Sequence, residues 1–143
     1  MLTIIFKRMF LFVAVSIFSF NLHAADWTMA SGYPKSNFHT QNIIKFIDDV
    51  KSTTSVNINL NPNDTLIKLD AIKTSLQRGQ IPIGEIRLGI YGNEDPMYIL
   101  AGLPFIAPDY SSAWLLKDVQ MEYLQEKFDK KGLMILYLSL IHI

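Results

Sequence analysis

The sequence predicts an α/β fold with mostly parallel strands, because strand-like and helix-like patterns alternate along it. Residues 56–60 (VNINL) alternate apolar and polar side chains, which is typical of a strand with one buried face. Apolar residues recur at helical spacing shortly before this strand, at Ile43, Phe46, Ile47 and Val50. A chain whose strands and helices alternate in this way is expected to build a parallel sheet.

The elements of the first half follow in order. Asp26–Ala30 (DWTMA) is the first predicted strand, and residues 31–34 form a loop because glycine and proline interrupt regular structure. The first helix is predicted over residues 37–51, with its apolar stripe facing the core. The polar run 52–55 ends this helix before the strand at 56–60.

The second half begins with a turn at residues 61–64, in which Asp64 is a candidate helix cap. A second helix carries Leu69, Ile72 and Leu76 on one face and ends at Gly79 in a left-handed conformation. The apolar, glycine-containing run 81–88 is then predicted as a buried strand.

The last predicted elements are a helix and a strand. Ser111 or Ser112 opens the helix, which runs from Ala113 to about Asp129 with an interruption near residues 118–120. Two lysines and a glycine at 130–132 close it, as cations and glycine favour a helix C-terminus. Residues 133–137 are predicted as the next strand.

Residues 1–24 have the three-part layout of a secretory signal peptide. Lys7 and Arg8 supply the positive start, residues 9–20 are an apolar run, and a short polar stretch ends at Ala24. The alternative is a membrane anchor, but the apolar run is shorter than the roughly 20 residues that a spanning helix needs. We therefore expect cleavage after Ala24 and a protein that works in the periplasm.

The last six residues, 138–143 (LSLIHI), match the translation of CTG TCT CTT ATA CAC ATC. This DNA resembles the transposon end used in sequencing-library preparation. We interpret the segment as adapter read-through and the chain as truncated; the alternative is a genuine apolar strand end.

The composition excludes several classes of function. The chain of 143 residues has no cysteine, which excludes disulfides, cysteine-ligated zinc and thiol catalysis. Thirteen basic residues balance 13 acidic ones without a basic block, so no nucleic-acid partner is expected. His23 and His142 fall in the two terminal segments, which leaves His39. One histidine is too few for a histidine metal site and leaves little basis for a catalytic triad. We therefore expect no metal, no cofactor and no enzymatic activity.

Several short stretches occur in a characteristic order. They are residues 33–39 (YPKSNFH), Asn61-Pro62 with Leu66, residues 79–85 (GQIPIGE), residues 101–106 (AGLPFI) with Tyr110 and Ala113, and residues 131–133 (KGL). As an ordered set they resemble the DctP-type periplasmic substrate-binding proteins of TRAP transporters.

The resemblance implies a periplasmic-binding-protein-like fold of two α/β lobes that closes on a small organic acid. It also implies delivery of that ligand to TRAP membrane permease subunits driven by an ion gradient. Family members are about twice as long, so residues 25–137 would be the N-terminal part of the solute-binding domain and would contain most of the first lobe.

Arg87 is the leading candidate for ligand binding. It is expected near the C-terminal end of the third strand, where open α/β sheets place their ligand crevice. A guanidinium there would bind a carboxylate through two hydrogen bonds. The alternative is a surface arginine, and Glu85, two residues earlier, could be the partner that makes Arg87 structural.

Four further residues are candidates for the ligand site. Tyr33 and Asn37 belong to the loop after the first strand, where Tyr33 is expected to line a pocket and Asn37 could instead cap the first helix. Lys68 is expected at the start of the second helix, with solvation as the alternative. Tyr91 follows the third strand and borders either the ligand or the core.

Three other functions stay open from the sequence. The chain could serve a different importer or a sensor kinase as its binding protein. A secreted α/β hydrolase-like enzyme is weakened because no G-x-S-x-G motif occurs. A secreted interaction domain without a small ligand is the third possibility.

Overall fold

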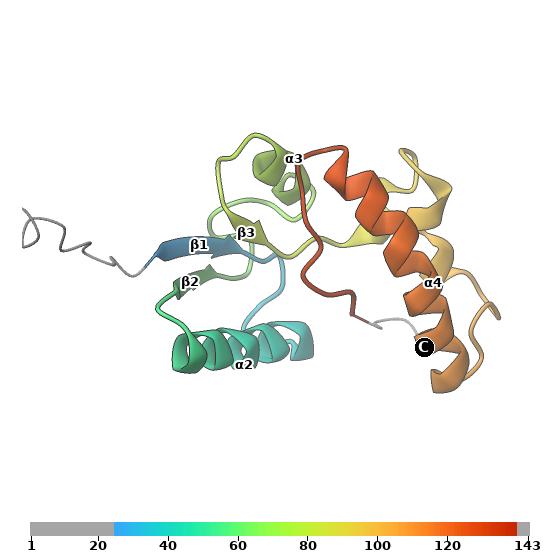
Figure 1. The fold of residues 1–143 in the computed structure, drawn as a ribbon, viewed down its shortest axis with the longest axis horizontal. Coiled ribbons are helices and arrows are strands. Elements are labelled where there is room, and N and C mark those ends of the chain that lie inside the picture. Colours follow the sequence, from blue (N-terminus) through green and yellow to red (C-terminus); the bar gives the residue numbers. More distant parts are fainter. Residues whose placement is uncertain (1–24, 140–143) are drawn as a thin grey trace, which may run out of the picture.

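The computed structural model describes residues 25–139, which form a three-stranded parallel sheet and the helices around it (Figure 1). The strands β1 (Asp26–Ala30), β2 (Asn57–Asn61) and β3 (Ile83–Gly84) lie in the order β2-β1-β3. β1 pairs along its whole length with β2, and its last two residues pair with β3. The predicted α/β fold with a parallel sheet is confirmed.

Helix α2 (Phe38–Thr53) covers one face of the sheet. The side chain of Asn37 caps it by accepting a hydrogen bond from the His39 N–H, and Thr54 ends it. Its apolar stripe packs on strand residues of the same parity; the buried members of this cluster are Met29, Ile43, Ile58 and Ile83. The helix predicted over 37–51 is confirmed.

Helix α3 (Ile72–Gln77) covers the opposite face, where Ala30, Ile72 and Ile81 form a second buried cluster. Ile72 lies so close to β3 that a Cβ on Gly84 would come within 2.7 Å of its Cγ2. The prediction that Asp64 caps this helix is wrong. Asp64 lies eight residues earlier with φ 57°, and its carboxylate accepts a hydrogen bond from the Leu69 N–H within the preceding turn.

The strand predicted over 81–88 is much shorter than expected. β1 ends at Ala30, whose partner is Gly84, so the chain beyond has no strand beside it on that edge. It continues instead as the short 3-10 helices η1 (Leu88–Tyr91), η2 (Pro96–Tyr98) and η3 (Leu100–Gly102).

Helix α4 (Tyr110–Asp129) is continuous, so the interruption predicted near residues 118–120 is wrong. Gln120 is a polar residue on the buried face of α4, where its side chain donates a hydrogen bond to the Met97 carbonyl. The N-cap is Asp109, whose carboxylate accepts from the Ser112 N–H, rather than Ser111 or Ser112. Gly132 (φ 69°) follows the C-cap, as predicted.

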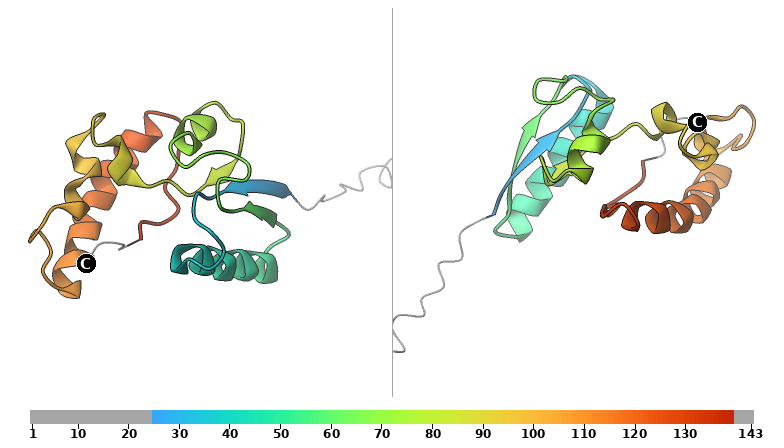
Figure 2. Two further views of the ribbon diagram at one scale, coloured as in Figure 1. Left: turned by 180° about the vertical axis from the view of Figure 1, so that it is seen from behind. Right: turned by 90° about the horizontal axis from the view of Figure 1, so that it is seen from above.

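The strand predicted over 133–137 is wrong. This segment runs between the sheet and α4 without pairing to a described strand (Figures 1 and 2). Leu133, Ile135 and Leu138 pack against the third cluster of Tyr91, Tyr98, Leu124 and Phe128. Leu133 and Ile135, which the sequence placed in a strand, instead pack against a cluster that contains Leu124 and Phe128 of α4.

Two predictions fall on residues that the structure does not describe. The signal peptide predicted over 1–24 lies entirely outside the described residues, as do residues 140–143 of the predicted read-through. Within residues 25–139, no helix combines the length and apolar character needed to cross a membrane.

Candidate functional site

The three parallel strands end on the same side of the sheet, which we call the carboxyl edge. It consists of residues 31–33 after β1, 62–64 after β2 and 85–87 after β3. Open parallel sheets bind their ligands in the crevice outside this edge. In the structure it faces α4 and the segment that follows α4 (Figure 1).

Backbone hydrogen bonds hold the loops after β1 and β2 together. The Ser31 N–H donates to the Asn61 carbonyl at 3.0 Å, and the Asn63 N–H donates to the Tyr33 carbonyl at 2.9 Å. The Thr40 hydroxyl of α2 also donates to the Tyr33 carbonyl. The loops after β1 and β2 are therefore fixed relative to each other before a ligand arrives.

Ser31 and Glu85 join the end of β1 to the end of β3. Ser31 is fully buried, and its hydroxyl donates a 2.5 Å hydrogen bond to Glu85 Oε2. The Glu85 N–H donates to the Ala30 carbonyl, which continues the ladder by one step. Burial raises the pKa of the Glu85 carboxyl, and the Ser31 hydroxyl opposes this by stabilising the carboxylate.

Arg87 lies at the carboxyl edge and is exposed. Its backbone is extended (φ −93°, ψ 104°) and precedes η1. Among residues 25–139 its guanidinium has no carboxylate within salt-bridge distance, and Glu85 bonds to Ser31 instead. The structure therefore does not show the structural Glu85–Arg87 pair that the sequence left open.

Tyr33 and Asn37 lie together on the loop after β1. Tyr33 is half-buried, with its ring centroid 5.1 Å from that of His39. Asn37 accepts from the His39 N–H at 2.9 Å, so its side-chain oxygen performs the capping role that was the alternative to ligand contact.

Lys68 and Tyr91 are placed differently. Lys68 is exposed in the turn before α3, four residues ahead of Ile72, so the expected position at the start of that helix is corrected. Tyr91 is buried; its hydroxyl donates to the Asp70 carbonyl at 3.0 Å. Burial also raises the Tyr91 pKa. Tyr91, the last residue of η1, thus packs against η2 and α4 and its hydroxyl bonds to the turn before α3.

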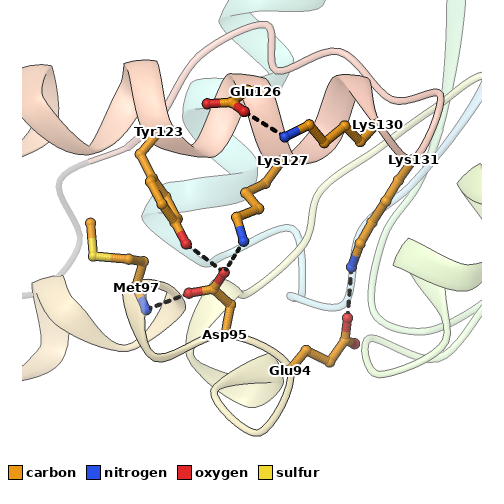
Figure 3. A network of polar contacts seen from close by, with 8 residues as sticks. All are labelled: Glu94, Asp95, Met97, Tyr123, Glu126, Lys127, Lys130 and Lys131. Carbon is orange, nitrogen blue, oxygen red and sulfur yellow. Dashed lines mark hydrogen bonds and ion pairs between the residues drawn. The ribbon is translucent and has the colours of Figure 1, made fainter.

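A charged cluster that the sequence did not reveal connects α3, the 3-10 region and α4. Lys73 of α3 is 2% exposed; it bonds to Glu94, and its ammonium lies 4.0 Å from the centroid of the Tyr91 ring. The other Glu94 oxygen accepts from Lys131 at 2.9 Å (Figure 3). Hydrogen bonds from both lysines hold the pKa of Glu94 below its ordinary value.

The neighbouring Asp95 fastens η2 to α4 (Figure 3). Its carboxylate accepts from the Met97 N–H at 3.0 Å and from the Tyr123 hydroxyl at 2.8 Å, and it pairs with Lys127 at 3.1 Å. The Met97 N–H, followed by the Tyr123 hydroxyl, lowers the pKa of Asp95. No sequence pattern pointed to Tyr123 or Lys127, which lie 28 and 32 positions away.

Metal binding finds no support in the described part of the chain. Residues 25–139 contain no group of three or more histidine, aspartate or glutamate side chains placed to hold a metal ion.

Three solved structures resemble the chain in both sequence and fold. DctP6 of Bordetella pertussis, an extracytoplasmic solute receptor binding pyroglutamic acid, is 39% identical over 79% of this chain, with a TM-score of 0.76. DctP7 of the same organism, also binding pyroglutamic acid, is 33% identical over 80%, with a TM-score of 0.75. A marine metagenome TRAP solute-binding protein in complex with pyroglutamate is 30% identical over 81%, with a TM-score of 0.76.

This chain corresponds to part of a DctP-type TRAP solute receptor. It spans 38%, 38% and 39% of the length of these three receptors, and so matches part of their two-lobed α/β fold. No family model matches the chain, and no curated protein does.

Proposed function

We propose that residues 25–137 are the N-terminal part of the solute-binding domain of a TRAP receptor, and that this receptor captures a small organic acid and delivers it to TRAP permease subunits. The observation that carries the proposal is the 39% identity to a DctP-type receptor over 79% of this chain. All three relatives above bind pyroglutamate, so a pyroglutamate-like carboxylate is the proposed ligand class. On this proposal residues 138–143 are adapter read-through, and the DNA beyond codon 143 of the source gene tests that assignment.

The proposed mechanism is capture rather than chemistry. The Arg87 guanidinium binds the ligand carboxylate at the carboxyl edge, and Tyr33 forms an aromatic wall beside it. Lys68 adds positive potential at the rim, while Asn37 and Tyr91 hold their loops in place. Closure of the second lobe excludes water and strengthens these contacts.

Ligand screening tests this function directly. In the full-length receptor, L-pyroglutamate at about 100 times its Kd should stabilise the folded state by about 2.7 kcal/mol. Thermal unfolding with a panel of organic acids measures the effect, with 2-pyrrolidone as the matched control because it keeps the lactam ring and lacks the carboxylate. A panel in which no carboxylate shifts the unfolding temperature would contradict the proposal.

We also propose that residues 1–24 direct the receptor to the periplasm. A reporter fused after residue 26 should be exported and cleaved, because residues 1–24 contain the basic start and the apolar run of a signal peptide. The control is the same reporter fused to residues 25 onward of the receptor, which should stay in the cytoplasm. Fractionation and N-terminal sequencing provide the readout, and an uncleaved cytoplasmic 1–26 fusion would refute the assignment.

A further inference from the structure

Glu85 is an unusual residue at the carboxyl edge because its carboxylate is half-buried without a cationic partner. No lysine or arginine among residues 25–139 lies within salt-bridge distance of it. Burying a carboxylate without a counter-charge costs free energy unless hydrogen-bond donors replace the lost water. One such donor, the Ser31 hydroxyl, is present at 2.5 Å.

The two oxygens of Glu85 are in different situations. Oε2 accepts a hydrogen bond from the Ser31 hydroxyl, and the Ser31 oxygen in turn accepts one from the Tyr33 N–H at 3.3 Å. Oε1 has no hydrogen-bond donor among the described residues, and no buried polar atom there lacks a partner. Oε1 therefore faces accessible space, in an orientation that Ser31 fixes.

Glu85 and Arg87 flank Ile86, whose side chain packs into the two neighbouring hydrophobic clusters. This arrangement puts a fixed hydrogen-bond acceptor next to a free guanidinium at one edge of the sheet. The complementary ligand carries an N–H donor on the atom adjacent to the carbon that bears its carboxylate. Pyroglutamate has this pattern, because its lactam nitrogen is bonded to the carbon that carries the carboxylate.

We propose that Glu85 is a specificity-determining residue that accepts the ligand's N–H through Oε1, with Ser31 as its positioning residue. The inference rests on the proposed function and deepens it. A ligand with a ring ester oxygen or a second carboxylate at this point places lone pairs or a like charge against Oε1, so the site selects lactams and related N–H carboxylates over lactones and dicarboxylates.

Keeping this half-buried carboxylate ionised costs folding free energy, which fits a residue retained for ligand binding rather than for stability. Burial raises the pKa of Glu85, and a folded-state pKa above the unfolded value means that stability is lost as the pH rises through the folded-state pKa. The hydrogen bond from Ser31 opposes this rise, and burial together with the Glu85 charge raises the pKa of the neighbouring Tyr137. Glu85→Gln removes the charge and keeps the shape, so this variant is expected to fold.

The test compares two ligands on two proteins. L-Pyroglutamate and its lactone analogue, 5-oxotetrahydrofuran-2-carboxylate, differ by N–H against ring oxygen. By calorimetry, the wild-type full-length receptor should bind the lactam about 10- to 100-fold more tightly, which is the range for a hydrogen bond to a charged group. In Glu85→Gln the preference should fall to a few-fold. The exposed Glu122→Gln on α4 is the matched control and should keep the wild-type preference.

Ser31→Ala adds a readout that a purely structural role would not produce. It should reduce the lactam preference while leaving the lactone Kd nearly unchanged, because it frees the orientation of Glu85 without removing the acceptor. Equal binding of lactam and lactone by the wild type, or an unchanged preference in Glu85→Gln, would overturn the role of Glu85 while the receptor function stands. If the wild type bound neither ligand nor any other organic acid, the proposed function would fall and this inference with it. If a variant does not fold, equal binding of lactam and lactone by the wild type still overturns the role of Glu85.

Discussion

Replacing Arg87 with alanine in the full-length receptor should raise the Kd for the organic acid by roughly 30-fold or more. Removing one partner of a desolvated, hydrogen-bonded charge pair costs about 2–5 kcal/mol, of which the lower limit corresponds to that factor. Arg87 has no competing carboxylate among the described residues, so its guanidinium does not have to break an ion pair to bind a ligand. Because the side chain is exposed, the fold should be unaffected, and calorimetry beside thermal unfolding separates the two effects.

Arg78→Ala is the matched control for the Arg87 prediction. Arg78 is also exposed, but it lies at the C-terminal end of α3, before β3 begins, and is not part of the carboxyl edge. The Arg78→Ala substitution removes the same positive charge as Arg87→Ala. A comparable loss of affinity in both variants would therefore indicate a general electrostatic effect. Arg87→Lys should recover only part of the binding, because an ammonium cannot form the two parallel hydrogen bonds of a guanidinium. An unchanged Kd in Arg87→Ala would assign this residue to the surface.

Replacing Glu94 with glutamine should lower the free energy of unfolding by about 2 kcal/mol. Breaking a buried ion pair costs about 3–5 kcal/mol because an uncompensated charge stays behind, and here that charge is the 2% exposed ammonium of Lys73. Glu94 itself is 36% exposed, so solvent screens part of the interaction and reduces the expected loss below that range, to about 2 kcal/mol. Urea unfolding of the full-length receptor measures the change.

Glu126→Gln is the control for the Glu94 prediction. Glu126 pairs with Lys130 at 2.5 Å one turn away on α4, but both side chains are about two-thirds exposed (Figure 3). Exposed pairs of this kind contribute little, so the variant should unfold at nearly the wild-type urea concentration. Equal destabilisation by the two substitutions would show that burial of Lys73 does not matter.

The ion pair between Glu94 and Lys73 also predicts that the stability of the receptor depends on pH. The pKa of Glu94 is lowered in the folded state, so its stabilising contribution is complete above the unfolded pKa of about 4.3 and is lost as the pH falls through the folded value. Between pH 6 and pH 3, Glu94→Gln should therefore lose less stability than the wild type, because glutamine does not titrate.

Local patterns were sufficient for the first half of the fold. The alternation at 56–60 predicted β2, and the apolar stripe from Ile43 to Val50 predicted α2 within two residues at its end. Each pattern reports burial on one face, and in this part of the chain every strand has a neighbouring strand and every amphipathic helix has a sheet to cover. The positive φ at Gly79 and Gly132 was also predictable, since glycine adopts this conformation without strain.

The errors share one cause, which is that an apolar run indicates burial but not the partner. Leu133 and Ile135 are partly buried against the cluster that contains Leu124 and Phe128 of α4 and have no strand beside them, and most of 81–88 leaves the sheet where β1 ends. Gln120 looked like a break in α4 because its acceptor, the Met97 carbonyl, is 23 residues away in the chain.

The sequence by itself determined the α/β class, the parallel strands, the family resemblance and the position of Arg87 near the C-terminal end of the third strand. All of these depend on side-chain order and on spacing within one element or one loop. Tertiary structure alone decided that Glu85 bonds to Ser31 rather than to Arg87, and that Glu94 joins Lys73 to Lys131. These contacts join residues that are 54, 21 and 37 positions apart in the chain. They form only because folding brings those residues together in space. Propensity and periodicity act over a few residues, so no local pattern could have revealed them.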